Sequence, residues 1–310
     1  KKCNIHSVTS EYIYLMGISA SCSVYISTND KLHFDFYHTD GSTWAVLADS
    51  DMLFRDVSAW YHIVVSIDSS AGTTNADRVK LYVNGVQQDF TFTTYGSGTI
   101  TGDIKHLNQS GQTFQINSRP TKSYYGNFYL ANYHYIDGQA LDPTDFVAFD
   151  DSGVWQAAAY SGSFGTNGFH LFDFANESGI GNDSSGNDND FPVNNISSTA
   201  GAGNDVLFDV PTNGDSSDDT GVGEEVSGTY CTWHALDKET TTLSNGNLDA
   251  VVSLGSDHVL RGTFAVSSGK WYWEVDNINT GSGGYPIVGI ADANADNASS
   301  IWGNSTATGY

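Results

Sequence analysis

The chain has 310 residues, 39% of them apolar and 13% aromatic, which is long enough for two domains with hydrophobic cores of their own. Its 36 acidic and 12 basic side chains give a formal net charge of −24, which repels a phosphate backbone and predicts no nucleic-acid partner. No apolar run approaches the roughly 20 residues that cross a bilayer, so we expect no membrane insertion. Three widely spaced cysteines, Cys3, Cys22 and Cys231, do not favour a disulfide-stapled scaffold or a cysteine zinc site.

The composition favours strands and turns over helices. Thirty-three glycines accompany many Ser, Thr, Asn and Asp residues, and no long segment has an apolar period of 3.6 residues. Short alternating segments bounded by turn-forming residues predict strands at 23–26, 32–37 and 43–47, and a further strand at 169–174 that pairs back onto the first sheet. The predicted fold class is therefore all-β.

Two alternating segments on either side of a polar loop predict a β-hairpin. Apolar residues alternate with others in 60–67 and again in 79–83, as in strands that turn one face to a core. Asn84 and Gly85 supply the positive backbone angles of a type I′ turn, after which the chain is expected to return as a third strand from 86 to 92. In the first strand, the residues predicted to face the core are Tyr61, Ile63, Val65 and Ile67.

These residues resemble a known superfamily. Trp60-Tyr61-His62, Asp68 and Val-Lys-Leu-Tyr-Val-Asn-Gly at 79–85 are similar to the laminin-G-like members of the concanavalin-A-like jelly rolls. Residues 126–131 and 135–143 look like the closing strand and exit turn of jelly-roll modules in bacteriophage structural proteins. The resemblance implies an antiparallel jelly-roll β-sandwich over residues 1–175, with an opening strand that begins within a longer polypeptide.

The rest of the chain is interpreted as a connector and a second sandwich. Residues 176–228 are rich in Gly, Asn, Asp and Ser, as linkers and loops are. Residues 229–310 resemble the N-terminal part of a SPRY-like β-sandwich that continues beyond Tyr310, chiefly through Gly-Lys-Trp-Tyr-Trp-Glu-Val at 269–275. Strands are predicted there at 240–248, 259–266 and 270–275, with Trp271 and Trp273 in the core.

The candidates for carbohydrate chemistry are few. Glu274-Val275-Asp276 resembles the start of the Glu-x-Asp-x-x-Glu pattern of concanavalin-A-like glycosidases, but Asn279 occupies the last position, so no catalytic residues are predicted. An aromatic ring can stack on the apolar face of a sugar, or can equally cover the core. The candidate carbohydrate-binding residues are Trp44, Tyr124, Tyr125 and Trp302.

One segment has candidate ligands for a metal. Asp183, Asp188 and Asp190 lie close together in a Gly-rich stretch, and their short oxygen-bearing side chains are those that calcium prefers. The stretch lacks the terminal glutamate of an EF-hand, so a solvated turn is the favoured interpretation and calcium is the one candidate cofactor.

The resemblance also implies a function. It predicts a non-enzymatic bacteriophage virion structural protein, a tail fibre or capsid appendage, located on the virion surface or extracellularly. Such a protein binds host-surface glycans or other virion proteins and assembles as a homo-oligomer, with a trimer expected. The alternatives are a secreted carbohydrate-active enzyme and a bacterial surface adhesin, because jelly rolls host all three functions.

Overall fold

The computed structural model divides into two compact units, Lys1–Ser198 with Val210–Thr229, and Thr199–Asp209 with Tyr230–Tyr310. The residues that the structure describes are 12–19, 22–38, 44–56, 59–93, 104, 106–107, 109–119, 126, 128–149, 155–158, 160–172, 179–194, 196, 231–234, 241–244, 247–251, 260–264, 269–275 and 288–290. Within this part of the chain, no helix has the length and apolar character needed to span a lipid bilayer.

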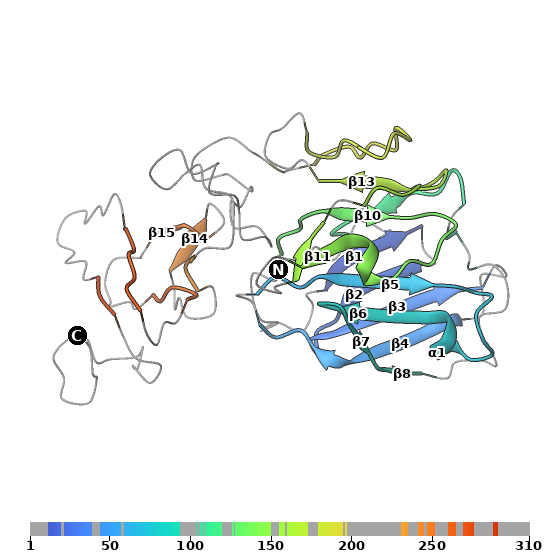
Figure 1. Ribbon diagram of the computed structural model, residues 1–310, viewed down its shortest axis with the longest axis horizontal. Helices are drawn as coiled ribbons and strands as arrows, with labels where there is room; N and C mark the ends of the chain where they lie inside the picture. Colours follow the sequence, from blue (N-terminus) through green and yellow to red (C-terminus); the bar gives the residue numbers. More distant parts are fainter. Residues whose placement is uncertain are drawn as a thin grey trace. The chain divides into compact units, whose positions relative to one another are not determined.

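The first unit is built from antiparallel sheets, which confirms the predicted all-β class (Figure 1). The largest sheet has six strands in the order β8-β4-β3-β2-β1-β9, and a three-stranded sheet has the order β5-β6-β7. The strands of these two sheets are β1 (Ile13–Ile18), β2 (Cys22–Ile26), β3 (Lys31–Tyr37), β4 (Trp44–Leu53), β5 (Ile63–Ile67), β6 (Val79–Val83), β7 (Val86–Gln88), β8 (Phe90–Phe92) and β9 (Phe114–Gln115).

A single hydrophobic core joins the two sheets into a sandwich. In β3, the buried Leu32, Phe34 and Phe36 alternate with half-buried residues, as the period of two requires. Leu81 and its buried neighbours in β6 belong to the same cluster as these residues of β3. Because burial of each large apolar side chain contributes about 1.5–3 kcal/mol, this shared core stabilises the packing of one layer on the other.

The predicted hairpin is present. β5 and β6 pair antiparallel, and Asn84 and Gly85 connect β6 to β7 with φ angles of 48° and 79°, both positive as a type I′ turn needs. The Asn84 side chain also accepts a hydrogen bond from the backbone N–H of His62, at 2.9 Å, which ties the turn to the start of β5. The core-facing residues of the first strand pack against the core as predicted: Tyr61, Ile63, Val65 and Ile67.

Two features of this region differ from the prediction. The polar loop contains a short helix, α1 (Asn75–Arg78), which a capping box between Thr74 and Asp77 begins. The third strand is not continuous, because β7 pairs with β6 whereas β8 pairs with β4 in the other sheet. The chain crosses between the layers at Asp89, which lets Phe90 pack on Phe34 with ring centroids 5.0 Å apart.

Two small sheets complete the first unit. β10 (Tyr133–Tyr135) pairs with β13 (Phe169–Leu171), and β11 (Val147–Phe149) follows the 3-10 helix η1 (Pro143–Phe146) and pairs with β12 (Trp155–Ala157). β13 therefore pairs with β10 and not with the largest sheet. Among the described residues of 126–131, Phe128 forms a β-bridge and none belongs to a strand.

The described part of the second unit contains one hairpin, β14 (Thr242–Ser244) with β15 (Asp249–Val251), where a single strand over 240–248 was expected. A β-bridge joins Trp233 to Gly262 inside the predicted strand 259–266. The Trp233 indole N–H donates to the carbonyl of Leu248 at 2.9 Å, which holds this bridge against the hairpin.

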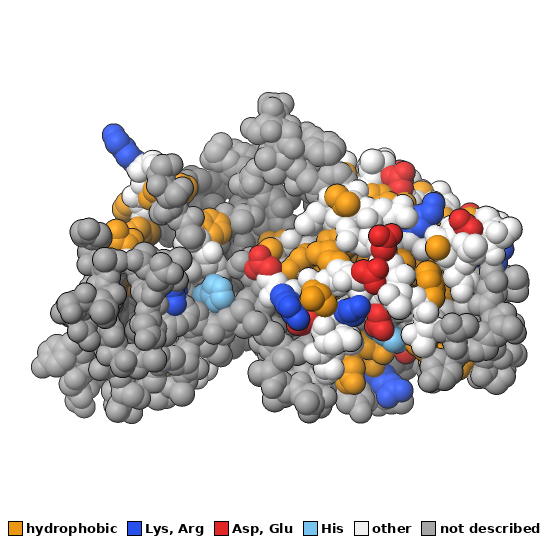
Figure 2. All heavy atoms as spheres, turned by 90° about the horizontal axis from the view of Figure 1, so that it is seen from below, with side chains coloured by type: hydrophobic (Ala, Val, Ile, Leu, Met, Phe, Trp, Pro, Cys, Tyr) orange, Lys and Arg blue, Asp and Glu red, His pale blue; other side chains and the backbone are white. Residues whose placement is uncertain are grey.

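The prediction of a strand at 270–275 with Trp271 and Trp273 in a second core is wrong. Residues 270–275 are not in a strand, and Trp271 and Trp273 are 63% and 54% exposed. A strand needs a hydrogen-bonded neighbour, and no described strand pairs with this segment, so its alternation places side chains in solvent. Figure 2 shows hydrophobic side chains at the surface of the described parts of both units, with acidic and basic side chains interspersed among them on the first unit.

Candidate functional site

A groove of about 270 Å³ opens on the first unit where β1, β9, β10 and β13 come together. Its walls come from five stretches of the sequence: the end of β1, residues 106–114 with β9, the end of β10, residues 167–169 with the start of β13, and the loop at 189–192. Concave sites with apolar floors and a few polar groups are the usual form of ligand sites in proteins.

The floor of the groove is aromatic. Phe114 lies at its centre, with ring centroids 5.1 Å from Tyr135, 4.9 Å from Phe169 and 5.9 Å from Phe191. β-pairing positions these rings, since Phe114 is opposite Ile18 and Tyr135 is opposite Phe169 in the register. Phe169 is buried, whereas the other three rings are half-buried and leave part of their surface open to a ligand.

Polar groups surround this floor. Gln112 accepts a hydrogen bond from the Ser19 hydroxyl at 2.9 Å, which fixes its amide group. The Asn189 side-chain amide donates to the carbonyl of Gly168 at 2.9 Å. The described polar side chains that line the groove are His106, Gln109, Ser110, Gln112, Asn167, Asn189 and Asp190.

The loop that forms one wall is held by Asp183. Its carboxylate accepts hydrogen bonds from the backbone N–H groups of His170, Ser185 and Asn189, at 2.9, 2.8 and 3.0 Å, and from the Ser185 hydroxyl. The hydrogen bonds lower the pKa of Asp183, against the opposing effect of its burial. Residues 179–194, which the sequence assigns to the connector, thus pack onto β13.

These contacts bear on the calcium prediction. The Asp183 carboxylate accepts hydrogen bonds from residues of its own loop. Asp190 in turn accepts a hydrogen bond from the Asp183 N–H at 2.8 Å. Asp188 is exposed, with a φ of 58°. Within the described residues, no group of three or more His, Cys, Asp or Glu side chains converges as a metal site requires, so the structure does not bring the three aspartates together.

The predicted carbohydrate-binding residues do not form the groove. Trp44 stacks on Tyr37, with ring centroids 3.8 Å apart, on the six-stranded sheet. Tyr124, Tyr125 and Trp302 lie outside the described residues. Sequence reasoning missed the aromatic floor, because Phe114 stands alone among polar residues and only the β1 pairing brings it to the other rings.

A second cavity, of about 250 Å³, lies beside α1 and the outer face of β5 and β6. Its carboxylates are engaged locally: Asp68, Asp77 and Asp142 each accept hydrogen bonds from a hydroxyl and a backbone N–H a few residues away. These hydrogen bonds lower the pKa of all three. Its described lining offers Tyr82 as the one aromatic ring, so the groove at Phe114 is the better candidate site.

Comparison with models of known protein families gave no match, and comparisons with curated proteins and with solved structures gave none either. The geometry of the groove is therefore the basis on which a function is assigned. Both walls and floor of this site come from the first unit.

Proposed function

We propose that this protein is a non-enzymatic binding protein whose groove at Phe114 takes a glycan, and that it serves as a bacteriophage virion structural protein. The observation that supports this most strongly is the combination of accessible aromatic rings with a ring of amide and hydroxyl groups in one groove. The axial C–H groups of a pyranose pack on an aromatic face, while its hydroxyls both donate and accept hydrogen bonds.

Several polar groups of the groove are available to a ligand. Gln109 and Ser110 are exposed at its edge and make no side-chain hydrogen bond within the described residues. Gly111 has a φ of 77° and open space around it, so the edge is not obstructed there. Amide side chains both donate and accept, which matches the paired hydroxyls of a sugar better than it matches an ionic ligand.

The charges in the groove favour binding over hydrolysis. Glycosidases place two carboxyl groups about 5–9.5 Å apart across the scissile bond. Among the described lining residues, Asp190 is the one carboxylate, and one of its oxygens already accepts the Asp183 N–H.

The resemblance of residues 126–131 and 135–143 to jelly-roll modules of bacteriophage structural proteins supports the virion assignment. On this proposal, the protein is a tail-fibre or capsid appendage at the virion surface, with host-surface glycans or neighbouring virion proteins as partners. The homo-oligomeric state, with a trimer expected, belongs to the same proposal.

Titration of the whole chain with a panel of bacterial surface polysaccharides, followed by calorimetry, tests the groove. We expect at least one polysaccharide to bind, and Ser110→Trp to weaken its binding by more than about tenfold because the indole fills the groove. Gln87→Trp is the matched control, since Gln87 is also exposed but lies on β7, outside the groove. Failure of every polysaccharide to bind, equal binding by Ser110→Trp, or release of new reducing ends would overturn the proposal.

A further inference from the structure

The fixed charge of the groove at Phe114 comes from one side chain. Among the described residues that line it there is no lysine or arginine, and Asp190 is the one carboxylate. His106 is the one described lining residue that gains a positive charge near neutral pH. The chain as a whole has a formal net charge of −24, which repels an anionic ligand as it approaches. The described groove therefore disfavours glycans with carboxylate or phosphate groups.

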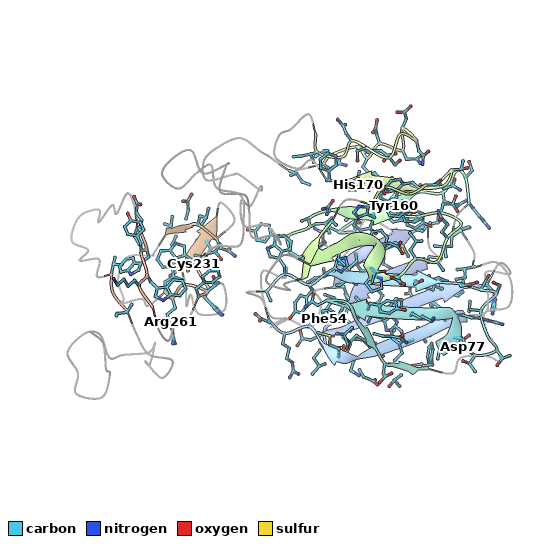
Figure 3. The ribbon with its side chains drawn as sticks, viewed as in Figure 1. Phe54, Asp77, Tyr160, His170, Cys231 and Arg261 are labelled. Carbon is cyan, nitrogen blue, oxygen red and sulfur yellow. The ribbon has the colours of Figure 1, made fainter. Side chains whose placement is uncertain are left out.

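The Asp190 carboxylate is tied to its own loop through one oxygen. Its Oδ1 atom accepts a hydrogen bond from the backbone N–H of Asp183 at 2.8 Å. Asp183 is held in turn by the backbone N–H of His170 on β13, and Figure 3 labels His170 on that strand, with the loop running beside it. Within the described part of the chain, the Oδ2 atom of Asp190 has no hydrogen bond, and Asp190 is exposed. One oxygen is thus positioned by the loop, and the other is open to a ligand.

An aromatic ring follows Asp190 directly in the chain. Phe191 packs on the floor of the groove, with its ring centroid 5.9 Å from Phe114 and 4.7 Å from Phe169. A cation is attracted both by a carboxylate and by the face of an aromatic ring, and Asp190 and Phe191 bring the two groups to the same wall. A hydroxyl also hydrogen-bonds to a carboxylate, but it lacks the charge that both groups attract. This wall therefore suits an ammonium group.

We propose that the groove takes a glycan with a free amine, as in a hexosamine that is not N-acetylated, and that Asp190 pairs with the protonated amine. The hydroxyls of the sugar contact the amide side chains of the groove, and the ammonium group lies at the wall formed by Asp190 and Phe191. This inference rests on the proposed function, because it assigns a chemical class to the glycan of the same site. Asp190 is then the residue that determines specificity for charge.

Matched forms of the same polysaccharide test the amine directly. Bacterial polysaccharides with free amines are titrated into the whole chain by calorimetry before and after N-acetylation with acetic anhydride, which converts each ammonium group into a neutral amide. Because an exposed ion pair and a cation–π contact each contribute modestly, we expect the free-amine form to bind roughly tenfold more tightly. Equal binding of the two forms, or tighter binding of the N-acetylated form, overturns the inference.

Asp190→Asn identifies the residue responsible. Its side-chain oxygen still accepts the Asp183 N–H, so the loop keeps this hydrogen bond while the negative charge is lost. Asp188→Asn is the matched control, because Asp188 is exposed on the same loop, lies outside the groove and changes the net charge by the same amount. We expect Asp190→Asn to lose most of the preference for the free amine and Asp188→Asn to keep it. An equal loss in both variants assigns the preference to overall charge and overturns the role of Asp190.

The amine class and the glycan site fail in different ways. If neutral or N-acetylated polysaccharides bind, Ser110→Trp weakens that binding and free amines bring no gain, the glycan site stands and the amine class is refuted. If no polysaccharide binds in either form, the proposed function is refuted and this inference with it. If Asp190→Asn does not fold, the comparison of the two forms on the parent chain decides alone.

Discussion

The six-stranded sheet and the β10–β13 pair each hold a half-buried titratable group, and the two groups respond to acid in opposite directions. Asp35 on β3 accepts a hydrogen bond from Ser23, yet burial raises its pKa to about 6. Burial lowers the pKa of His134 on β10 to about 4. The same physical cause, loss of hydration by the charged form, favours a proton on one group and disfavours it on the other.

The two groups therefore give opposite contributions to stability. The folded chain binds a proton at Asp35 more tightly than the unfolded chain does, so a fall in pH from about 6 towards 3.8 stabilises the fold. The unfolded chain binds a proton at His134 more tightly, so a fall from 6.5 towards about 4 destabilises it. A chain with 36 acidic side chains thus contains a local acid-labile point that its net charge does not reveal.

The largest effect is expected at His134. Between pH 7.5 and pH 4, its protonation should remove roughly 3 kcal/mol from the free energy of unfolding, and His134→Phe should remove most of this pH dependence. Urea unfolding of both chains at several pH values, followed by tyrosine and tryptophan fluorescence, measures the difference. Parallel pH profiles for the two chains would show that His134 is not the group responsible.

Asp35→Asn should act in the opposite direction and somewhat less strongly. At pH 7.5 the neutral amide avoids the cost of a buried carboxylate, so we expect the free energy of unfolding to rise by roughly 2 kcal/mol after allowance for solvent screening. The gain should disappear near pH 4, where Asp35 itself is protonated. A variant that is less stable than the parent chain at pH 7.5 would assign Asp35 a stabilising ionic role with Arg119 or His33, the two cations that lower its pKa.

Gly85→Ala supplies a reference variant, because its effect on the free energy of unfolding should not depend on pH. Gly85 has a φ of 79° at the second position of the type I′ turn, where a side chain costs about 1–2 kcal/mol. The loss should be equal at pH 7.5 and pH 5, as measured by the same urea titrations. A loss that changes with pH would mean that the turn is coupled to one of the titrating clusters.

A sequence-based prediction was confirmed where the structure depends on adjacent residues alone, and it was wrong where the structure also needs a distant strand. Residues 32–37 and 270–275 both alternate, but β3 lies between β2 and β4, whereas no described strand flanks the second segment. Alternation predicts which side chains share a face, and it does not predict that a neighbouring strand covers that face. The type I′ turn was predictable because Asn84 and Gly85 carry its requirements in two adjacent residues.

The groove was not predictable for a related reason. Phe114 and Phe169 are 55 positions apart in the printed sequence, and the residues around each of them do not predict a contact with the other. The pairing of β9 with β1, and of β10 with β13, brings them within 4.9 Å. Asp183 was named as a candidate calcium ligand, and in the structure its carboxylate accepts hydrogen bonds from the backbone N–H groups of His170, Ser185 and Asn189.

The single residue between β7 and β8 has a mechanical consequence. Asp89 is the whole link between a strand of one sheet and a strand of the other, and its carbonyl accepts a hydrogen bond from the Asp51 N–H at 3.0 Å. Because one residue spans less than about 4 Å, this link holds the end of β7 close to the start of β8, at the edge where the two sheets meet. We therefore expect the two sheets to separate last at this edge when the chain is unfolded by force.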